Sequence, residues 1–151
     1  MTENKKENLN NRMIKFLFEG APVRGACVQM AEEWQEMIKF HHYPENVAAL
    51  LGQFTAGALL LSSTIKFEGS LILQVKGSGP IAFIYAEVRN PMSVRAMAEI
   101  REGAEIKPEM DLQELINKDG KGLCALILDP KDRRYMAIRF EEYSPPEYFT
   151  A

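Results

Sequence analysis

The sequence predicts an α+β fold in which a long buried apolar helix lies between two antiparallel β-sheets, with an amphipathic helix on the surface. Three patterns support this prediction. Residues 47–61 are apolar at eleven of fifteen positions, and apolar side chains recur at helical spacing over residues 28–40. From residue 65 onward, apolar residues mostly alternate with polar ones, which is typical of half-buried strands. A length of 151 residues suits one domain with a sizeable core.

The composition excludes several classes of protein. A hydrophobic fraction of 46% and a charged fraction of 26% are ordinary globular values, so the whole chain is neither disordered, coiled coil nor collagen. A net charge of −3 gives no general attraction for nucleic acid. Two cysteines, Cys27 and Cys124, cannot form a four-ligand zinc site or a disulfide framework. Their apolar neighbours predict buried thiols in a reducing cytosol, and a long-range disulfide is the less favoured alternative.

The first half of the chain contains a tail, a strand and two helices. Residues 1–12 are rich in Asn, Lys and Glu and predict a flexible tail, followed by a single domain over residues 13–151. The tail has no apolar run after its charges, so it is no secretory signal, and we expect a cytoplasmic protein. Residues 13–18 alternate as a first strand, and residues 20–25 indicate a loop or strand end. Residues 28–40 predict an amphipathic surface helix that stops before Pro44.

The apolar segment 47–61 is the most informative in the chain. A helix that is apolar all round is either buried on all sides or in a membrane. Fifteen residues at about 1.5 Å each span roughly 22 Å, which is short of a hydrocarbon core of about 30 Å. Gln53 also interrupts the run. The segment therefore predicts a central helix covered by other layers, and we expect no membrane partner.

The second half predicts a meander of strands. Ile65 and Phe67 alternate with polar residues before a turn at Gly69-Ser70, and three further apolar residues follow on one face. Residues 76–80 form a second turn before a strand over 81–88, and residues 94–100 suit a fourth strand. Asp111 is a plausible N-cap for a short helix. Residues 122–128 and 135–140 then predict a hairpin.

No set of residues in the sequence forms a convincing catalytic or metal site. His41-His42 has no third ligand nearby, and the turn at residues 76–80 is followed by proline and a strand, unlike a phosphate-binding loop. An enzyme that used Arg24, Arg95 or the turn carrying Lys76 as an anion site would need an acid or base beside it. The sequence supplies none, so we expect neither an enzyme nor a metal centre.

A succession of motifs resembles a known family. Phe16-Leu17-Phe18, Val23-Arg24-Gly25, Tyr43-Pro44, the apolar helix and residues 64–69 occur in that order, followed by residues 76–80 and Arg134-Tyr135. This order and spacing resemble the N-terminal domain of the heat-shock protein thirty-three family, redox-regulated holdase chaperones of bacteria, over about residues 12–140. The positions that carry the resemblance most directly are Val23, Arg24, Gly25, Lys66, Gly69, Gly77, Gly79, Pro80 and Arg95.

The resemblance implies a stress-response function and a regulatory mechanism. Members bind unfolded or aggregation-prone polypeptides through exposed apolar surface without ATP, and their active forms tend to dimerise. In the family, four cysteines of a C-terminal domain hold zinc, and their oxidation uncovers the client-binding surface. This chain has neither cysteine pair, so we expect no cofactor in it and zinc only in the family's C-terminal domain. A fragment of a longer chaperone and a naturally short relative are both open explanations.

The chaperone interpretation predicts a client-binding surface on the strands. The candidate residues are Ile65, Phe67, Leu71, Leu73, Val75, Ile81 and Phe83. One face of each strand must pack on the central helix, so at most half of these residues can contact a client. Their complete burial would contradict the prediction. The alternative is an interaction or dimerisation module of the same fold that has lost general client binding.

Overall fold

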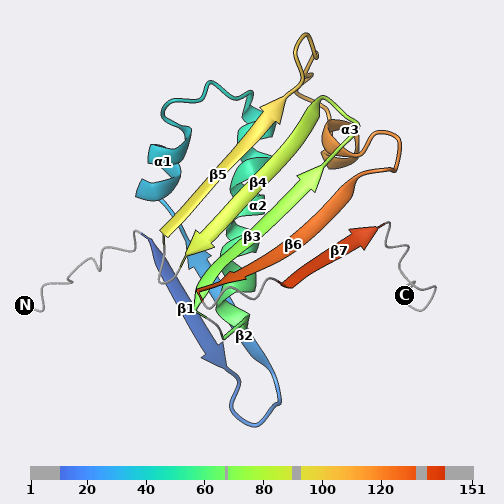
Figure 1. Cartoon of the computed structure of the whole chain (residues 1–151). Helices are drawn as coiled ribbons and strands as arrows, with labels where there is room; N and C mark the ends of the chain where they lie inside the picture. The colour runs from blue at the N-terminus through green and yellow to red at the C-terminus, as the bar shows by residue number, and fades with distance from the viewer. Residues whose placement is uncertain (1–10, 67, 90–92, 132–135, 142–151) are drawn as a thin grey trace, which may run out of the picture.

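The computed structural model describes residues 11–66, 68–89, 93–131 and 136–141, the last of these as backbone only. Its larger part is a five-stranded antiparallel sheet in the order β5-β4-β3-β6-β7, and a second sheet consists of β1 and β2 (Figure 1). The strands are β1 (Arg12–Leu17), β2 (Arg24–Gln29), β3 (Gly69–Lys76), β4 (Ile81–Arg89), β5 (Ser93–Ile100), β6 (Leu123–Pro130) and β7 (Met136–Glu141). The helices are α1 (Glu32–Ile38), α2 (Glu45–Thr64) and α3 (Leu112–Ile116).

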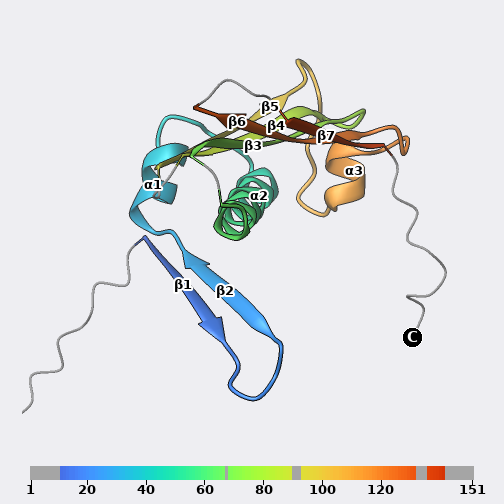
Figure 2. The same ribbon diagram turned by 60° about the horizontal axis from the view of Figure 1, so that its bottom comes forward.

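The helices all lie on one face of the five-stranded sheet. Figure 2 shows α2 between that sheet and the β1–β2 hairpin, with α1 and α3 to either side of α2. This arrangement confirms the predicted α+β class, with a long apolar helix between two antiparallel sheets.

The β1–β2 hairpin differs from the sequence prediction in its second strand. The first strand is confirmed, but it begins at Arg12, which pairs with Gln29. Residues 20–25 were expected as a loop or strand end, which agrees with the structure, because residues 20–23 form the loop and Arg24 begins β2. The expectation that a helix begins at Val28 is wrong, because β2 runs from Arg24 to Gln29. Val28 lies opposite Met13 and packs against the core, so pairing between the strands determines its conformation.

The amphipathic surface helix is confirmed over a shorter range, as α1. Its Trp34 side chain lies against Gly52 of α2, where an added Cβ would come within 3.4 Å of the indole ring. Trp34 also packs against the core cluster that contains Val47 and Leu51. The small residue at position 52 therefore allows α1 to pack closely on α2.

The central helix α2 is buried along one side. Its buried residues follow helical spacing at Val47, Leu51, Thr55, Ala58 and Leu59. The expectation of burial on all sides is wrong, because Gln53 is exposed and Leu61 is 40% exposed. By length and composition α2 could cross a membrane, but in this structure its apolar side packs against the sheet and forms the core.

Two adjoining clusters form the core between α2 and the sheet. The first contains Val47, Leu51, Ile81, Ile84, Ala98, Leu115 and Ile116. The second contains Ala58, Leu59, Leu71, Ala86, Val88 and Leu126. Burial of each large aliphatic side chain contributes roughly 1.5–3 kcal/mol, so these clusters hold the helix to the sheet.

The connection from α2 to the sheet is not the predicted strand and turn. The helix continues to Thr64, Ile65 and Lys66 lie outside any strand, and Phe67 is outside the described residues. Gly69 begins β3 instead of forming a turn. Its φ of +152° and the close approach of the Asp129 carbonyl leave no room for a side chain, so glycine is required there.

The remaining elements agree with the sequence predictions. Residues 76–80 connect β3 to β4, and β5 and the β6–β7 hairpin form where they were expected. Asp111 caps α3, since its carboxylate accepts a hydrogen bond of 2.9 Å from the Glu114 backbone N–H. The Glu114 carboxylate in turn accepts from the Asp111 N–H at 3.1 Å.

Candidate functional site

The candidate site is the face of the five-stranded sheet that points away from α2, which we call the outer face. In the part of the chain that the structure describes, the helices lie on the opposite side and no element covers this face (Figure 2). The register of the strands arranges its side chains in four rows. From β6 across to β5 these rows are Asp129, Ser70, Arg89 and Ser93; Ile127, Ile72, Glu87 and Arg95; Ala125, Gln74, Tyr85 and Met97; and Leu123, Lys76, Phe83 and Glu99.

The outer face carries accessible apolar surface beside polar groups. Met97 is 41% exposed, and Ile72 and Ile127 are half-buried. The Phe83 and Tyr85 rings stack at a centroid distance of 6.2 Å. Aromatic, aliphatic and thioether groups on an open sheet suit contact with apolar side chains of another polypeptide.

One ionic cluster lies among these apolar groups. The Glu87 side chain is only 4% exposed and accepts hydrogen bonds from three neighbours. Tyr85 donates its hydroxyl to Glu87 Oε2 at 2.6 Å, Arg95 donates Nε to the same oxygen at 2.6 Å, and Arg89 donates Nε to Oε1 at 2.8 Å. A second Arg95 nitrogen lies 2.5 Å from Oε2. The carboxylate therefore orients both arginines on the surface.

The charge state of this cluster is fixed near neutral pH. Burial of Glu87 raises the pKa of its carboxyl, but the hydrogen bonds from Tyr85, Arg95 and Arg89 lower it further, to about 2. Burial and the adjacent carboxylate raise the pKa of Tyr85. Neither group exchanges a proton readily at neutral pH, so the cluster suits ion pairing and hydrogen bonding better than acid–base catalysis.

The structure brings only part of the predicted client-binding set to this face. Leu71 and Ile81 are fully buried against α2, so the prediction is wrong for these two residues in the folded chain. Ile65, Leu73 and Val75 are half-buried and pack against the core clusters. Of the described candidates, Phe83 alone lies on the outer face.

A second hollow lies on the helical side of the sheet, and we call it the α2–α3 groove. Its volume is about 530 Å³. Its lining includes Leu50 and Phe54 of α2, Leu112 and Ile116 of α3, and Cys124 of β6. Among the described lining residues, no side chain is charged. Burial raises the pKa of the Cys124 thiol, which makes the groove unsuited to thiolate chemistry.

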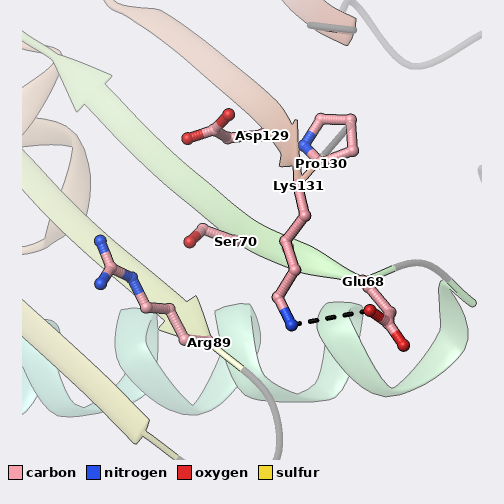
Figure 3. A pocket seen from close by; sticks show the side chains of 7 residues that line it. Glu68, Ser70, Arg89, Asp129, Pro130 and Lys131 are labelled. Carbon is pink, nitrogen blue, oxygen red and sulfur yellow. Dashed lines mark ion pairs between the residues drawn. The ribbon is translucent and has the colours of Figure 1, made fainter. Parts of the chain in front are cut away.

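A third surface, a hollow of mixed charge, lies where β3, β4 and β6 end. It measures about 630 Å³ and includes Glu68, Ser70, Arg89, Asp129 and Lys131 (Figure 3). Figure 3 shows the Lys131 amine pointing toward Glu68, at 3.6 Å from its carboxylate. Both side chains are well exposed, so this ion pair contributes little to stability.

The described residues contain no group of three or more His, Cys, Asp or Glu side chains that could hold a metal ion. His41 instead stacks on Tyr43 at a centroid distance of 5.1 Å. Cys27 lies exposed in β2, which corrects its predicted burial, and Cys124 lies in the other sheet. The two thiols are both free in this structure.

Comparison with known families decides which family the chain represents. Residues 11–139 match the family described as Hsp33 protein. The chain belongs to the Hsp33 family. The sequence resemblance to heat-shock protein thirty-three is thereby confirmed.

Curated Hsp33 relatives are named as chaperonins. The 33 kDa chaperonin of Aliivibrio salmonicida is 38% identical over 130 residues, which cover 85% of this chain and 43% of that relative. The 33 kDa chaperonin of Neisseria gonorrhoeae is 39% identical over 125 residues, which cover 83% of this chain and 41% of that relative. The chain thus spans about two fifths of the length of these curated relatives, and they place it in a chaperone family.

A solved Hsp33 structure has the same fold. The crystal structure of the 33 kDa chaperonin from Thermotoga maritima superposes with a TM-score of 0.68 at 19% identity, covering 89% of this chain and 47% of that one. At this identity the likeness establishes the fold alone.

The turn at residues 76–80, one of the segments on which the sequence resemblance rests, holds the end of α3 in this structure. The backbone N–H groups of Ser78 and Gly79 donate to the carbonyl of Ile116, the last residue of α3, at 3.0 and 3.4 Å. Added Cβ atoms at Gly77 or Gly79 would collide with carbonyls of α3. The Arg101 N–H donates to the Pro80 carbonyl at 2.8 Å. The glycine turn therefore anchors the end of α3 and leaves no space there for a phosphate.

The other motif positions have separate environments. The Phe16 ring lies over Gly25, where a Cβ would collide with it. Val23, Arg24 and Lys66 are exposed, and Gly69 begins β3. Of the described motif positions, Arg95 is the one placed on the outer face, through its ion pair with Glu87.

Proposed function

We propose that this chain is an ATP-independent holdase-type chaperone domain that binds unfolded or aggregation-prone polypeptides on the outer face of its five-stranded sheet. Membership of the Hsp33 family supports a chaperone role. The observation that carries the location is the half-exposed apolar surface, including Ile72, Phe83 and Met97, on a face that no described element covers. We further propose that it acts in the cytoplasm, without nucleic acid or membrane partners and without enzymatic activity.

The proposed activity does not depend on a thiol switch in this chain. Its two cysteines lie in different sheets, at Cys27 in β2 and Cys124 in β6. We therefore propose that no cofactor is needed for client binding by this chain. A zinc-dependent switch would require the cysteine pairs that the family carries in a separate domain.

The test is light scattering of a chemically unfolded client diluted into the chain, with and without a thiol oxidant. We expect suppressed aggregation under both conditions. Met97→Glu places a charge on the outer face and should weaken the suppression, because a buried unpaired charge opposes apolar contact. Leu61→Glu is the matched control, since Leu61 has nearly the same exposure, 40% against 41%, but lies on α2. Absence of suppression in the unmodified chain, or equal loss in both variants, would contradict the proposal.

A second candidate function is an interaction or dimerisation module, favoured by the β1–β2 hairpin. Leu17 is 81% exposed at the end of β1, and Phe16, Phe18 and Val23 are also exposed nearby. The Phe16 and Phe18 rings meet edge to face at 5.7 Å. Light scattering coupled to size-exclusion chromatography tests this function. A dimer that Leu17→Ser dissociates, in a chain that protects no unrelated client, would favour the module over the chaperone.

A further inference from the structure

The end of β7 lies at the rim of the α2–α3 groove. β7 ends at Glu141, which pairs with Leu123 of β6. The residues on either side of Leu123, Gly122 and Cys124, both line the groove. The described part of the chain therefore ends beside an apolar hollow, and residues 142–151 follow it in the sequence. Ten residues reach up to about 33 Å when extended, which is enough to follow a groove between two neighbouring helices.

The chemistry of residues 142–151 matches the groove. The segment contains three aromatic residues, Tyr143, Tyr148 and Phe149, and aromatic side chains bury more apolar surface than most others. A volume of about 530 Å³ falls within the usual range for an apolar binding pocket. Pro145-Pro146 has no backbone N–H groups, so fewer donors need partners when this segment is covered.

We propose that residues 142–151 dock in the α2–α3 groove of the same chain, with Tyr148 and Phe149 as the buried anchors. In this arrangement the glutamates of the segment, Glu142 and Glu147, remain in water, since no described residue of the lining carries a positive charge. This docking is independent of the proposed chaperone activity, which uses the opposite face of the sheet.

The covalent connection favours the chain's own segment over a second copy. A short tether keeps the docking residues at an effective concentration in the millimolar range. A separate chain at micromolar concentration competes poorly for the groove with a tethered segment at millimolar effective concentration. Docking therefore occurs within one molecule and is independent of protein concentration.

Cys124 provides a built-in test because its thiol lines the groove. In a Cys27→Ser background it is the chain's one remaining thiol. Replacing both anchors, Tyr148→Ser with Phe149→Ser, should speed alkylation of Cys124 by a maleimide about tenfold, which corresponds to about 1.4 kcal/mol of docking free energy. Phe40→Ser is the matched control, since it removes an exposed aromatic ring at the end of α1, and it should leave the rate unchanged.

Thermal melts of the same proteins separate docking from loss of the fold. The anchor variant should keep a cooperative melt while its alkylation accelerates. An unchanged alkylation rate in the anchor variant, or equal acceleration in the Phe40 control, would overturn the proposal.

A cross-link gives an independent readout. In the Cys27→Ser background, Phe149→Cys should form an intramolecular disulfide with Cys124 when oxidised glutathione accepts the two electrons and two protons. The product is a monomer that lacks both free thiols, and Phe40→Cys should not form it. Linkage only between two chains, increasing with protein concentration, would assign the groove to a second copy and overturn intramolecular docking.

Discussion

The two faces of the five-stranded sheet use alternate residues of the same strands for different purposes. On the inner face, Leu71 and Ile84 are fully buried beneath α2. One position away, Ile72 and Tyr85 are half-buried on the outer face, where no described element lies over them. A residue's place in the alternation thus determines whether it belongs to the core or to the candidate surface.

The two faces are also stabilised differently. The inner face is held by aliphatic packing over its whole length, whereas the outer face has an ionic cluster centred on Glu87. Apolar groups such as Met97 remain beside that cluster with part of their surface in water. Substitutions on the inner face should therefore reduce stability, and those on the outer face should mainly affect binding.

The largest expected effect on the free energy of unfolding comes from a substitution on the inner face. Leu71→Ala removes a fully buried side chain from the cluster that joins β3 to α2 and should lower the free energy of unfolding by about 2–5 kcal/mol. Ile72→Ala, one residue away on the outer face, should cost much less because its side chain is already part-exposed. Urea unfolding of both variants measures the difference. Equal losses would remove the distinction between the faces.

A smaller effect concerns Glu87 and depends on pH. Its folded-state pKa, about 2, is below the ordinary value of 4.5, so its ionisation stabilises the fold above pH 4.5, and that stability disappears as pH falls toward 2. The full lowering of the Glu87 pKa corresponds to roughly 3 kcal/mol of folding stability. Because its partners Arg89 and Arg95 are exposed, solvent screening reduces this contribution to about 2 kcal/mol.

The Glu87→Gln variant tests this linkage. Its deficit in unfolding free energy should be largest near neutral pH and shrink between pH 4.5 and 2, as followed by urea unfolding at several pH values. Ser93→Ala serves as a control, because it changes an exposed polar residue at the start of β5 without a carboxylate. A deficit that is constant over this pH range would contradict the assigned role of the carboxylate.

The smallest expected effect is at Met97. Because its side chain is 41% exposed on the outer face, Met97→Ala should change the free energy of unfolding by no more than about 0.5 kcal/mol. Chemical unfolding measures this change. A loss above about 1.5 kcal/mol would show that Met97 belongs to the core and would weaken its use as a probe of client binding.

Sequence patterns predicted the fold better than the site. Helical spacing identified α1, a nearly continuous apolar run identified α2, and alternation identified the meander, because each pattern reflects burial against a large apolar layer. The β2 strand was missed because its glycine and small residues give weak alternation, and its conformation depends on pairing with β1. The sequence also did not show that α2 is buried on one side only, because the extent of burial depends on how many layers surround the helix.

The same reasoning explains the errors in the candidate surface. The most regular apolar alternation, at Leu71, Leu73 and Val75, marks the face that packs on α2. The outer face mixes apolar and polar side chains, as at Ile72 and Gln74, so it gives no strong pattern. The sequence analysis named two residues of this face, Phe83 as a client-binding candidate and Arg95 as a motif position. The partner of Arg95, Glu87, became evident only from the strand register.

The contact of Trp34 with Gly52 makes one helix visible to fluorescence. Trp34 is the only tryptophan in the chain, so indole emission reports the packing of α1 on α2 and on the adjoining core cluster. Detachment of α1 would expose the ring to water and shift its emission to longer wavelength while the sheet keeps its circular dichroism. Comparing the two optical signals during heating would show whether α1 separates before the sheet unfolds.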